Sequence, residues 1–199
     1  MKNKLLFVLL TIAAIITFCK SINQTAGGYK SKIYLALQTN SSEATQLSEE
    51  ILDTLSHQTE NRWIAVDLFV KDKVQNLYSA ATSSDLESLS EQIKPTPSSD
   101  QALIQSINRV KDEVEQNQQQ NVYSFIVSQG TTNPATLSEI RHISQVLAQS
   151  HSTKMHITII GISPTNRLPM SDAFASLRGR VQFASAIDEE WQQLFDDIN

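Results

Sequence analysis

The sequence predicts a three-layer α/β/α domain of Rossmann-like type, built on a mainly parallel sheet of about six strands. Two observations predict this fold. Short apolar runs alternate with amphipathic stretches along residues 32–199. Several of the runs, notably YSFIV (123–127) and HITIIGI (156–162), are apolar at nearly every position, as in strands that are covered on both faces. Such strands need helices on either side of the sheet.

The expected strands are rich in β-branched and apolar residues and are bounded by polar or turn-forming ones. The first, KIYLALQT, leads directly into an amphipathic stretch, which is typical of a strand-to-helix unit. The second and third are separated by the charged turn KDK, which predicts a short connection between them. We expect strands at 32–39, 62–70, 75–82, 122–129, 154–162 and 180–185.

The expected helices carry apolar residues at helical spacing. In the first, Leu47, Ile51 and Leu55 lie on one face, Ser42 stands in the N-cap position, and the helix dipole favours Glu43 in the first turn. Prolines in KPTPSSD interrupt the second. We expect helices at 42–58, at 84–93, from Ser99 or Asp100 to the polar stretch 115–121, and at 133–151, 171–178 and 186–198.

The N-terminus has the form of an export signal. Lys2 and Lys4 precede an uninterrupted apolar stretch at 5–19, and small and polar residues follow. The stretch is shorter than the roughly 20 residues that cross a bilayer comfortably as a helix. We expect residues 1–19 to be a signal peptide or membrane anchor and residues 20–31 a flexible tether, so the protein is exported, either membrane-anchored or extracytoplasmic.

Cys19 is the single cysteine of the chain. It sits where a bacterial lipoprotein would be cleaved and acylated, so it is a candidate for lipid attachment. Phe18 stands where such signals carry a small residue, which leaves two alternatives: an uncleaved signal anchor, or cleavage near Ala26. A lone thiol excludes an internal disulfide.

The charge of the chain excludes nucleic acid as a partner. The formal net charge is -5. Residues 1–20 contain lysines and no acidic residue, so the domain that follows is more acidic than the whole chain. A surface of this kind offers nothing to replace the counterions around a phosphate backbone.

Candidate binding residues follow the expected strands. In an open sheet of this class, ligands bind beyond the carboxyl ends of the strands. The segments QTNSS after the first strand, KPTPSSD before a helix, and SQG after the fourth strand are therefore the candidate ligand-binding loops.

These loops, with the strand and helix pattern of about residues 32 to 198, resemble the von Willebrand factor A domain family. In that family the first strand ends in Asp-x-Ser-x-Ser, a Thr comes from a loop before a central helix, and Asp-Gly follows the central strand. Together they form a metal-ion-dependent adhesion site, whose metal completes its shell with a carboxylate from the partner protein. The resemblance implies a domain that binds another protein at its strand ends.

This chain departs from the family pattern at both acidic positions. Gln38 stands in place of the first Asp, Asn40 stands in place of the first Ser, and Ser42 matches the second Ser. Thr96 is the nearest candidate for the Thr, and Gln129 stands in place of the second Asp. We expect these five residues to form the face that binds the partner.

Amides in place of the two acids weaken the binding of a metal ion at this face. A hard divalent cation is held most strongly by ionised carboxylates, and each lost charge pair removes on the order of 1 to several kcal/mol. We therefore expect no tight Mg²⁺ site and no cofactor, with Asn40, Ser42 and Thr96 only weak metal candidates. Asp100 could supply an acid, but at a helix start we expect it to cap the helix.

No catalytic pattern accompanies these residues. None of the four histidines has a second histidine or a cysteine at ligand spacing, and the chain has no GxSxG elbow and no glycine-rich phosphate loop. We predict a noncatalytic domain that binds or scaffolds another protein at the cell envelope. The alternative is an envelope small-ligand receptor or hydrolase on another doubly wound fold. That alternative predicts a deep pocket with ionisable groups at the strand ends, whereas protein binding predicts a shallow polar surface.

Overall fold

The computed structural model describes most of the chain beyond the N-terminal segment. The expected signal or anchor at 1–19, its Cys19, and residues 20–28 and 30 of the expected tether lie outside the described part. The described residues are 29, 31–57, 62–81, 83, 85–117, 120–149, 154–186, 190–196 and 198.

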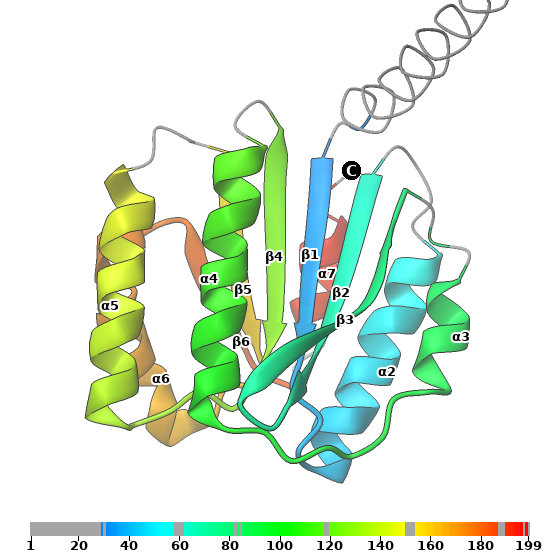
Figure 1. Cartoon of the computed structure of the whole chain (residues 1–199), viewed down its shortest axis with the longest axis horizontal. Helices are drawn as coiled ribbons and strands as arrows, with labels where there is room; N and C mark the ends of the chain where they lie inside the picture. The colour runs from blue at the N-terminus through cyan, green and yellow to red at the C-terminus, as the bar shows by residue number, and fades with distance from the viewer. Residues whose placement is uncertain are drawn as a thin grey trace, which may run out of the picture.

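The domain is built on a six-stranded sheet with the order β3-β2-β1-β4-β5-β6 (Figure 1). β3 pairs antiparallel with β2, and the remaining pairings between described strands are parallel. This confirms the predicted mainly parallel sheet. The strands are β1 (Ser31–Leu37), β2 (Arg62–Val70), β3 (Lys73–Ala80), β4 (Asn121–Val127), β5 (Met155–Ile160) and β6 (Val181–Ala184).

Helices cover both faces of the sheet, as predicted for strands that are apolar on both sides. Separate groups of helices pack on the two faces, each around its own apolar cluster, so the domain has three layers. One group is α4 (Asp100–Gln116), α5 (Pro134–Gln149), α6 (Pro164–Ala173) and the short 3-10 turn η1 (Ala175–Leu177); the other is α2 (Ser42–Ser56), α3 (Leu86–Ser90) and α7 (Glu190–Asp196).

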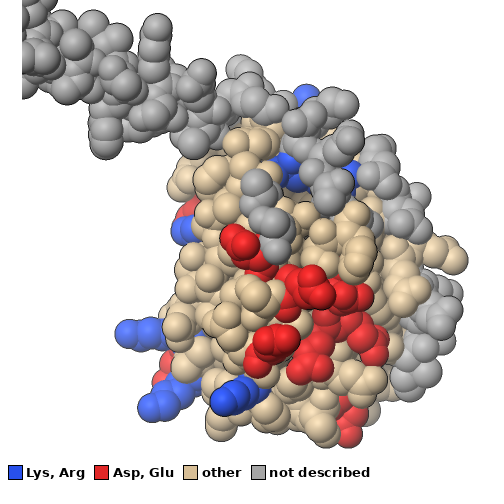
Figure 2. All heavy atoms as spheres, turned by 90° about the vertical axis from the view of Figure 1, so that its right-hand side faces the viewer, with Lys and Arg blue, Asp and Glu red and all other residues tan. Residues whose placement is uncertain are grey.

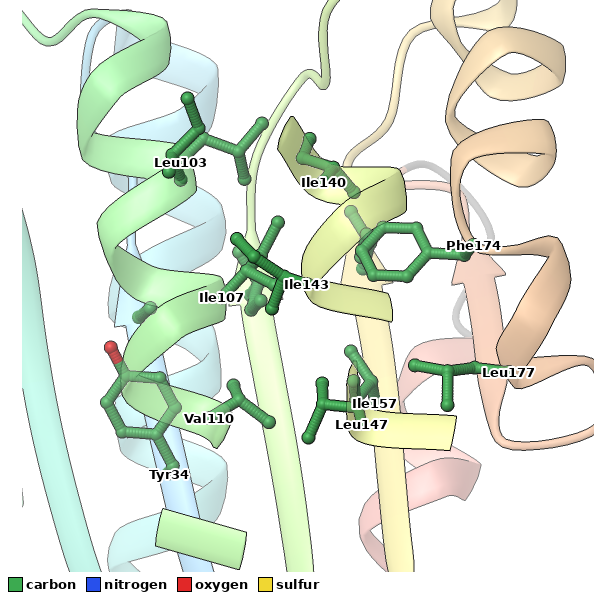
Figure 3. Close-up of a cluster of buried hydrophobic side chains, with 14 of the residues drawn as sticks. Tyr34, Leu103, Ile107, Val110, Ile140, Ile143, Leu147, Ile157, Phe174 and Leu177 are labelled. Carbon is green, nitrogen blue, oxygen red and sulfur yellow. The ribbon is translucent and has the colours of Figure 1, made fainter. Parts of the chain in front are cut away.

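The larger apolar cluster lies under α4 and α5. Figure 3 shows Ile107 and Val110 of α4 beside Ile143 and Leu147 of α5, with Phe174 to their right. All five of these side chains are buried. Burying each such side chain stabilises the fold by about 1.5–3 kcal/mol, so this contact is a main support of the sheet.

On the opposite face, α7 closes the second cluster with aromatic rings. Phe195 stacks on Phe125 of β4, with ring centroids 4.2 Å apart, and meets Trp191 edge-on at 5.9 Å. Leu47 and Ile51 of α2 pack in the same cluster, on the helix face that the sequence predicts.

The structure corrects two predicted helix starts. Ser41, not Ser42, is the N-cap of α2: its hydroxyl accepts a hydrogen bond from the backbone N–H of Ala44. α6 begins at Pro164, whereas the sequence predicts a helix from residue 171. A proline in the first turn lacks only an N–H that the helix would leave unpaired, so Pro164 begins the helix rather than preventing it.

A polar contact is buried beside the larger cluster. The Tyr34 hydroxyl donates to Asp67 Oδ2 at 3.1 Å, and Asn76 Nδ2 donates to Asp67 Oδ1 at 2.8 Å. The exposed fraction of Asp67 is 3%, so these donors replace the water that its carboxylate loses on folding. Burial, and then the charge of Asp67, raise the pKa of Tyr34 well above its usual value.

Replacing Tyr34 by Phe should weaken the fold at neutral pH and flatten its pH dependence at alkaline pH. The buried Asp67 carboxylate loses a donor, which costs about 1–3 kcal/mol. Because the pKa of Tyr34 is raised in the folded state, the unfolded chain loses this proton first. Wild type is therefore destabilised as the pH rises past about 10. Urea unfolding at neutral and alkaline pH measures both effects, and equal alkaline slopes for the two proteins would contradict the second.

Candidate functional site

The candidate site lies at the carboxyl ends of β1 and β4, at the bottom of Figure 1, while β1 starts at the opposite end with Ser31. Several loops meet there because the strands run parallel. We call the surface formed by the five predicted residues the strand-end face. Gln38 follows β1, Asn40 lies in the next loop, Ser42 opens α2, Thr96 lies between α3 and α4, and Gln129 follows β4.

The Gln38 amide is the central group of this face. Its Oε1 accepts hydrogen bonds from Ser128 Oγ at 3.0 Å and from the backbone N–H of Gln129 at 3.1 Å. Its Nε2 donates to Ser98 Oγ at 3.1 Å. One neutral side chain therefore joins the loop after β1, the loop after β4 and the segment that precedes α4. The structure thus brings Gln38 against the backbone of Gln129.

Thr96 is held by the loop after β1. Its backbone N–H donates to the Thr39 carbonyl at 2.7 Å. Its hydroxyl and that of the fully buried Thr39 both donate to the Lys94 carbonyl, at 2.9 and 3.0 Å. Thr96 is half-buried, and both its side chain and its backbone N–H serve to fix the loop.

The other three predicted residues present their side chains to solvent. Asn40, Ser42 and Gln129 are all exposed. The backbone carbonyl of Gln129 accepts hydrogen bonds from Asn166 Nδ2 at 2.9 Å and from the backbone N–H of Ser163 at 3.1 Å, so α6 fixes the loop after β4. The exposed side chain of Gln129 therefore projects from a loop whose backbone is held by hydrogen bonds.

Asp100 does not cap its helix as the sequence predicts. The N-cap of α4 is Ser99, whose hydroxyl accepts a hydrogen bond from the backbone N–H of Gln101. The Asp100 carboxylate instead accepts hydrogen bonds from Thr131 Oγ1 at 2.6 Å and Thr136 Oγ1 at 3.2 Å. It therefore ties α4 to the segment after β4. No local sequence signal indicates this contact, because packing alone brings the two segments together.

The side chains present do not fit the metal site that the family resemblance implies. The five residues of the strand-end face include no carboxylate, and the Gln38 carbonyl oxygen already accepts two hydrogen bonds. Within the described part of the chain, no group of three or more His, Cys, Asp or Glu side chains could hold a metal ion. A hard divalent cation would meet only neutral oxygens here.

A small hollow of about 70 Å³ adjoins this face. Ser41, Glu43, Leu47, Ser128 and Gln129 are among its lining residues, and Glu43 is the only one with an ionisable side chain among the described residues that line it. The pKa of Glu43 lies below its usual value, because the carboxylate accepts hydrogen bonds from its own backbone N–H and from the Ser41 hydroxyl. The face is therefore shallow and mostly neutral.

The flank of the molecule beside this face is acidic. Figure 2 shows Asp and Glu side chains gathered on the side formed by α2 and α3. The exposed acidic residues on these helices include Glu43, Glu50, Asp53 and Glu87. An acidic surface of this kind repels polyanions.

None of the helices in the described ranges is both long enough and apolar enough to span a bilayer. That finding does not extend to residues 1–28, where the sequence places the apolar segment.

Comparison with known proteins finds similar structures but no similar sequence. No protein-family model and no curated protein matches the sequence. The chain is similar to an aerotolerance-related membrane protein from Bacteroides fragilis with multiple mutations to serines: TM-score 0.60, 9% identity, covering 84% of this chain and 97% of that one. It is similar to proximal thread matrix protein 1 from the mussel byssus, which has a zinc-occupied MIDAS motif: TM-score 0.57, 13% identity, covering 87% and 46%.

A further similar structure is the pilus adhesin SpaC from Lactobacillus rhamnosus GG: TM-score 0.55, 9% identity, covering 86% of this chain and 30% of that one. At these identities the likeness shows the fold alone. The described domain has a von Willebrand A-like fold, as the resemblance at the strand ends implies.

Replacing Gln38 by Leu should destabilise the domain by about 1–3 kcal/mol. The Ser128 hydroxyl and the Gln129 N–H lose their acceptor at a part-buried position. The matched control is Gln129→Leu, which changes an exposed side chain and should alter the free energy of unfolding by less than about 0.5 kcal/mol. Urea denaturation measures both. Equal stability of the two variants would show that the Gln38 amide does not join the loops as described.

Proposed function

We propose that this protein is a noncatalytic, exported or membrane-tethered von Willebrand A-like domain that binds another protein at the cell envelope through its strand-end face, without a tightly bound metal. The observation that carries the proposal is the Gln38 amide, which stands where the family has an acidic metal ligand and is engaged by Ser98, Ser128 and the backbone of Gln129. A degenerate metal site leaves a surface of neutral hydrogen-bonding groups.

The shape of the site supports protein binding over catalysis. The hollow beside the strand-end face measures about 70 Å³ and has one ionisable group, Glu43, among its described lining residues. Pockets that enclose drug-sized ligands measure roughly 300–1,000 Å³ and carry convergent polar groups. The envelope receptor or hydrolase considered as the alternative predicts such a pocket at the strand ends. A shallow surface with exposed Asn40, Ser42 and Gln129 fits a protein partner better.

The similar structures support an envelope setting in general terms. One is described as a membrane protein and another as a pilus adhesin. The direction of β1 agrees with this setting. The chain enters β1 at Ser31, at the end of the domain opposite the strand-end face. An anchor at 1–19, whether retained as a helix or acylated at Cys19, would therefore direct the face away from the membrane.

A metal titration tests whether the strand-end face binds a divalent cation. The full chain in detergent micelles is titrated with Mg²⁺ or Mn²⁺ by calorimetry, and wild type should show no saturable heat below about 1 mM. The double variant Gln38→Asp, Gln129→Asp restores both carboxylates and should bind more tightly, since each adds a charge pair with the ion. Micromolar binding by wild type would contradict the proposal.

Site-specific crosslinking tests the partner face directly. A photo-reactive residue replaces Asn40 or Gln129 in the full chain, expressed in its native host. The matched control position is Gln149, which is exposed at the other end of the domain on α5. We expect adducts of the same mass from the two face positions and none from the control. Adducts from Gln149 alone would place the partner elsewhere.

A further inference from the structure

The hollow beside the strand-end face has an apolar floor. It lies between α2 and the last residues of β4 and β5, with a volume of about 70 Å³, and it is lined by the buried side chains of Leu47, Val127 and Ile160. Gly161 keeps this space open: a Cβ there would lie 3.2 Å from Leu47 Cδ2, and its φ of +83° is one that other residues rarely adopt. The hollow can therefore accept an apolar group from outside the protein.

The polar rim of the hollow presents acceptor oxygens to a partner. The Ser41 hydroxyl donates to the Glu43 carboxylate, and Ser128 Oγ donates to Gln38 Oε1 at 3.0 Å. Both hydroxyl protons are thus used inside the protein. Glu43 is exposed, and among the described residues that line the hollow no side chain is basic. The rim therefore favours a hydrogen-bond donor that carries a positive charge.

The acidic charge continues along α2 from the rim of the hollow. Glu50 lies seven residues after Glu43, so both lie on one face of the helix, about 10 Å apart along its axis. Both are exposed, as is Asp53 about one turn further on. Figure 2 shows the acidic side chains gathered on this flank. The surface beside the hollow therefore attracts a basic partner and repels an acidic one.

Lysine and arginine side chains match this combination of an apolar floor and an acidic rim. Their methylene stems pack along apolar surface while the charged end stays in water. The volume of about 70 Å³ suits one such stem, since pockets for whole small ligands measure roughly 300–1,000 Å³. A carboxylate from the partner would instead be repelled by Glu43.

We propose that the partner of the strand-end face presents a basic segment, with the stem of one lysine or arginine in the hollow over Leu47 and its charged end at Glu43. The inference rests on the proposed function, because it gives the chemistry of the partner that binds the same face. It extends the contact surface along α2 as far as Glu50.

Methyl NMR of the full chain, in micelles of a zwitterionic detergent, tests this chemistry. The probe is the capped peptide Gly-Lys-Gly-Lys-Gly-Lys-Gly. One control peptide carries Nε-acetylated lysines, which keep the stems without the charges, and the other carries glutamates. We expect saturable shifts of the Leu47 and Val127 methyl signals with the lysine peptide, about threefold or more weaker binding of the acetylated peptide, and no binding of the glutamate peptide. Equal affinity for the lysine and acetylated peptides, or no saturable shift with the lysine peptide, would overturn the proposal.

Substitutions separate the hollow from general attraction to an acidic protein. Glu43→Gln should weaken binding of the lysine peptide about two- to fivefold, because an exposed ion pair is lost. Its control, Glu139→Gln, removes the charge of an exposed acid on α5 and should leave the affinity unchanged. Ala44→Leu places a larger side chain in the hollow and should abolish the Val127 shifts, whereas Ala135→Leu in the exposed first turn of α5 should not. Unchanged affinity in Glu43→Gln would contradict the proposal even if the Ala44 variant does not fold.

Failure of this inference differs from failure of the proposed function. Crosslinked adducts from Asn40 and Gln129, without binding of the lysine peptide, would keep the proposed function and remove the basic partner. Adducts from Gln149 alone would remove the proposed function and this inference together, even if the lysine peptide bound.

Discussion

The structure depends on β1 being paired with parallel neighbours on both sides and covered on both faces. Residues Ile33 to Leu37 are fully buried, and β1 pairs in register with β2 and β4 along its length. Parallel strands need long return connections, and here these are the helices that cover the sheet. The same geometry brings the loops after β1 and β4 together at one end of the sheet, where exposed polar side chains such as Asn40 and Gln129 lie.

At the carboxyl ends of β1 and β4, side-chain hydrogen bonds join segments that lie far apart in sequence. Gln38 links Ser98 and Ser128, and Asp100 links α4 to Thr131 and Thr136. The Asp100 side chain thus fixes one segment to another. A face built this way is held in place by its own hydrogen bonds.

The fold could be predicted from the sequence because hydrophobic period and strand burial are local properties of the chain. The predicted starts of two helices were wrong because the sequence allows more than one reading there. Pro164 is typical of a loop but also suits the first turn of a helix. Ser41 and Ser42 are equally good N-cap residues. The Asp100 contacts could not be predicted, because they depend on how segments far apart in sequence pack.

The direction of β1 also has a mechanical consequence. The chain enters the domain at Ser31 and reaches the strand-end face directly after Leu37, so β1 is the shortest covalent route between the two ends. In the arrangement proposed above, tension between a membrane anchor and a partner held at the face would act along this strand. To extract it, the force must shear the hydrogen bonds to β2 and β4 together rather than unzip them one at a time. Pairing on both sides therefore makes β1 resistant to shear along that axis.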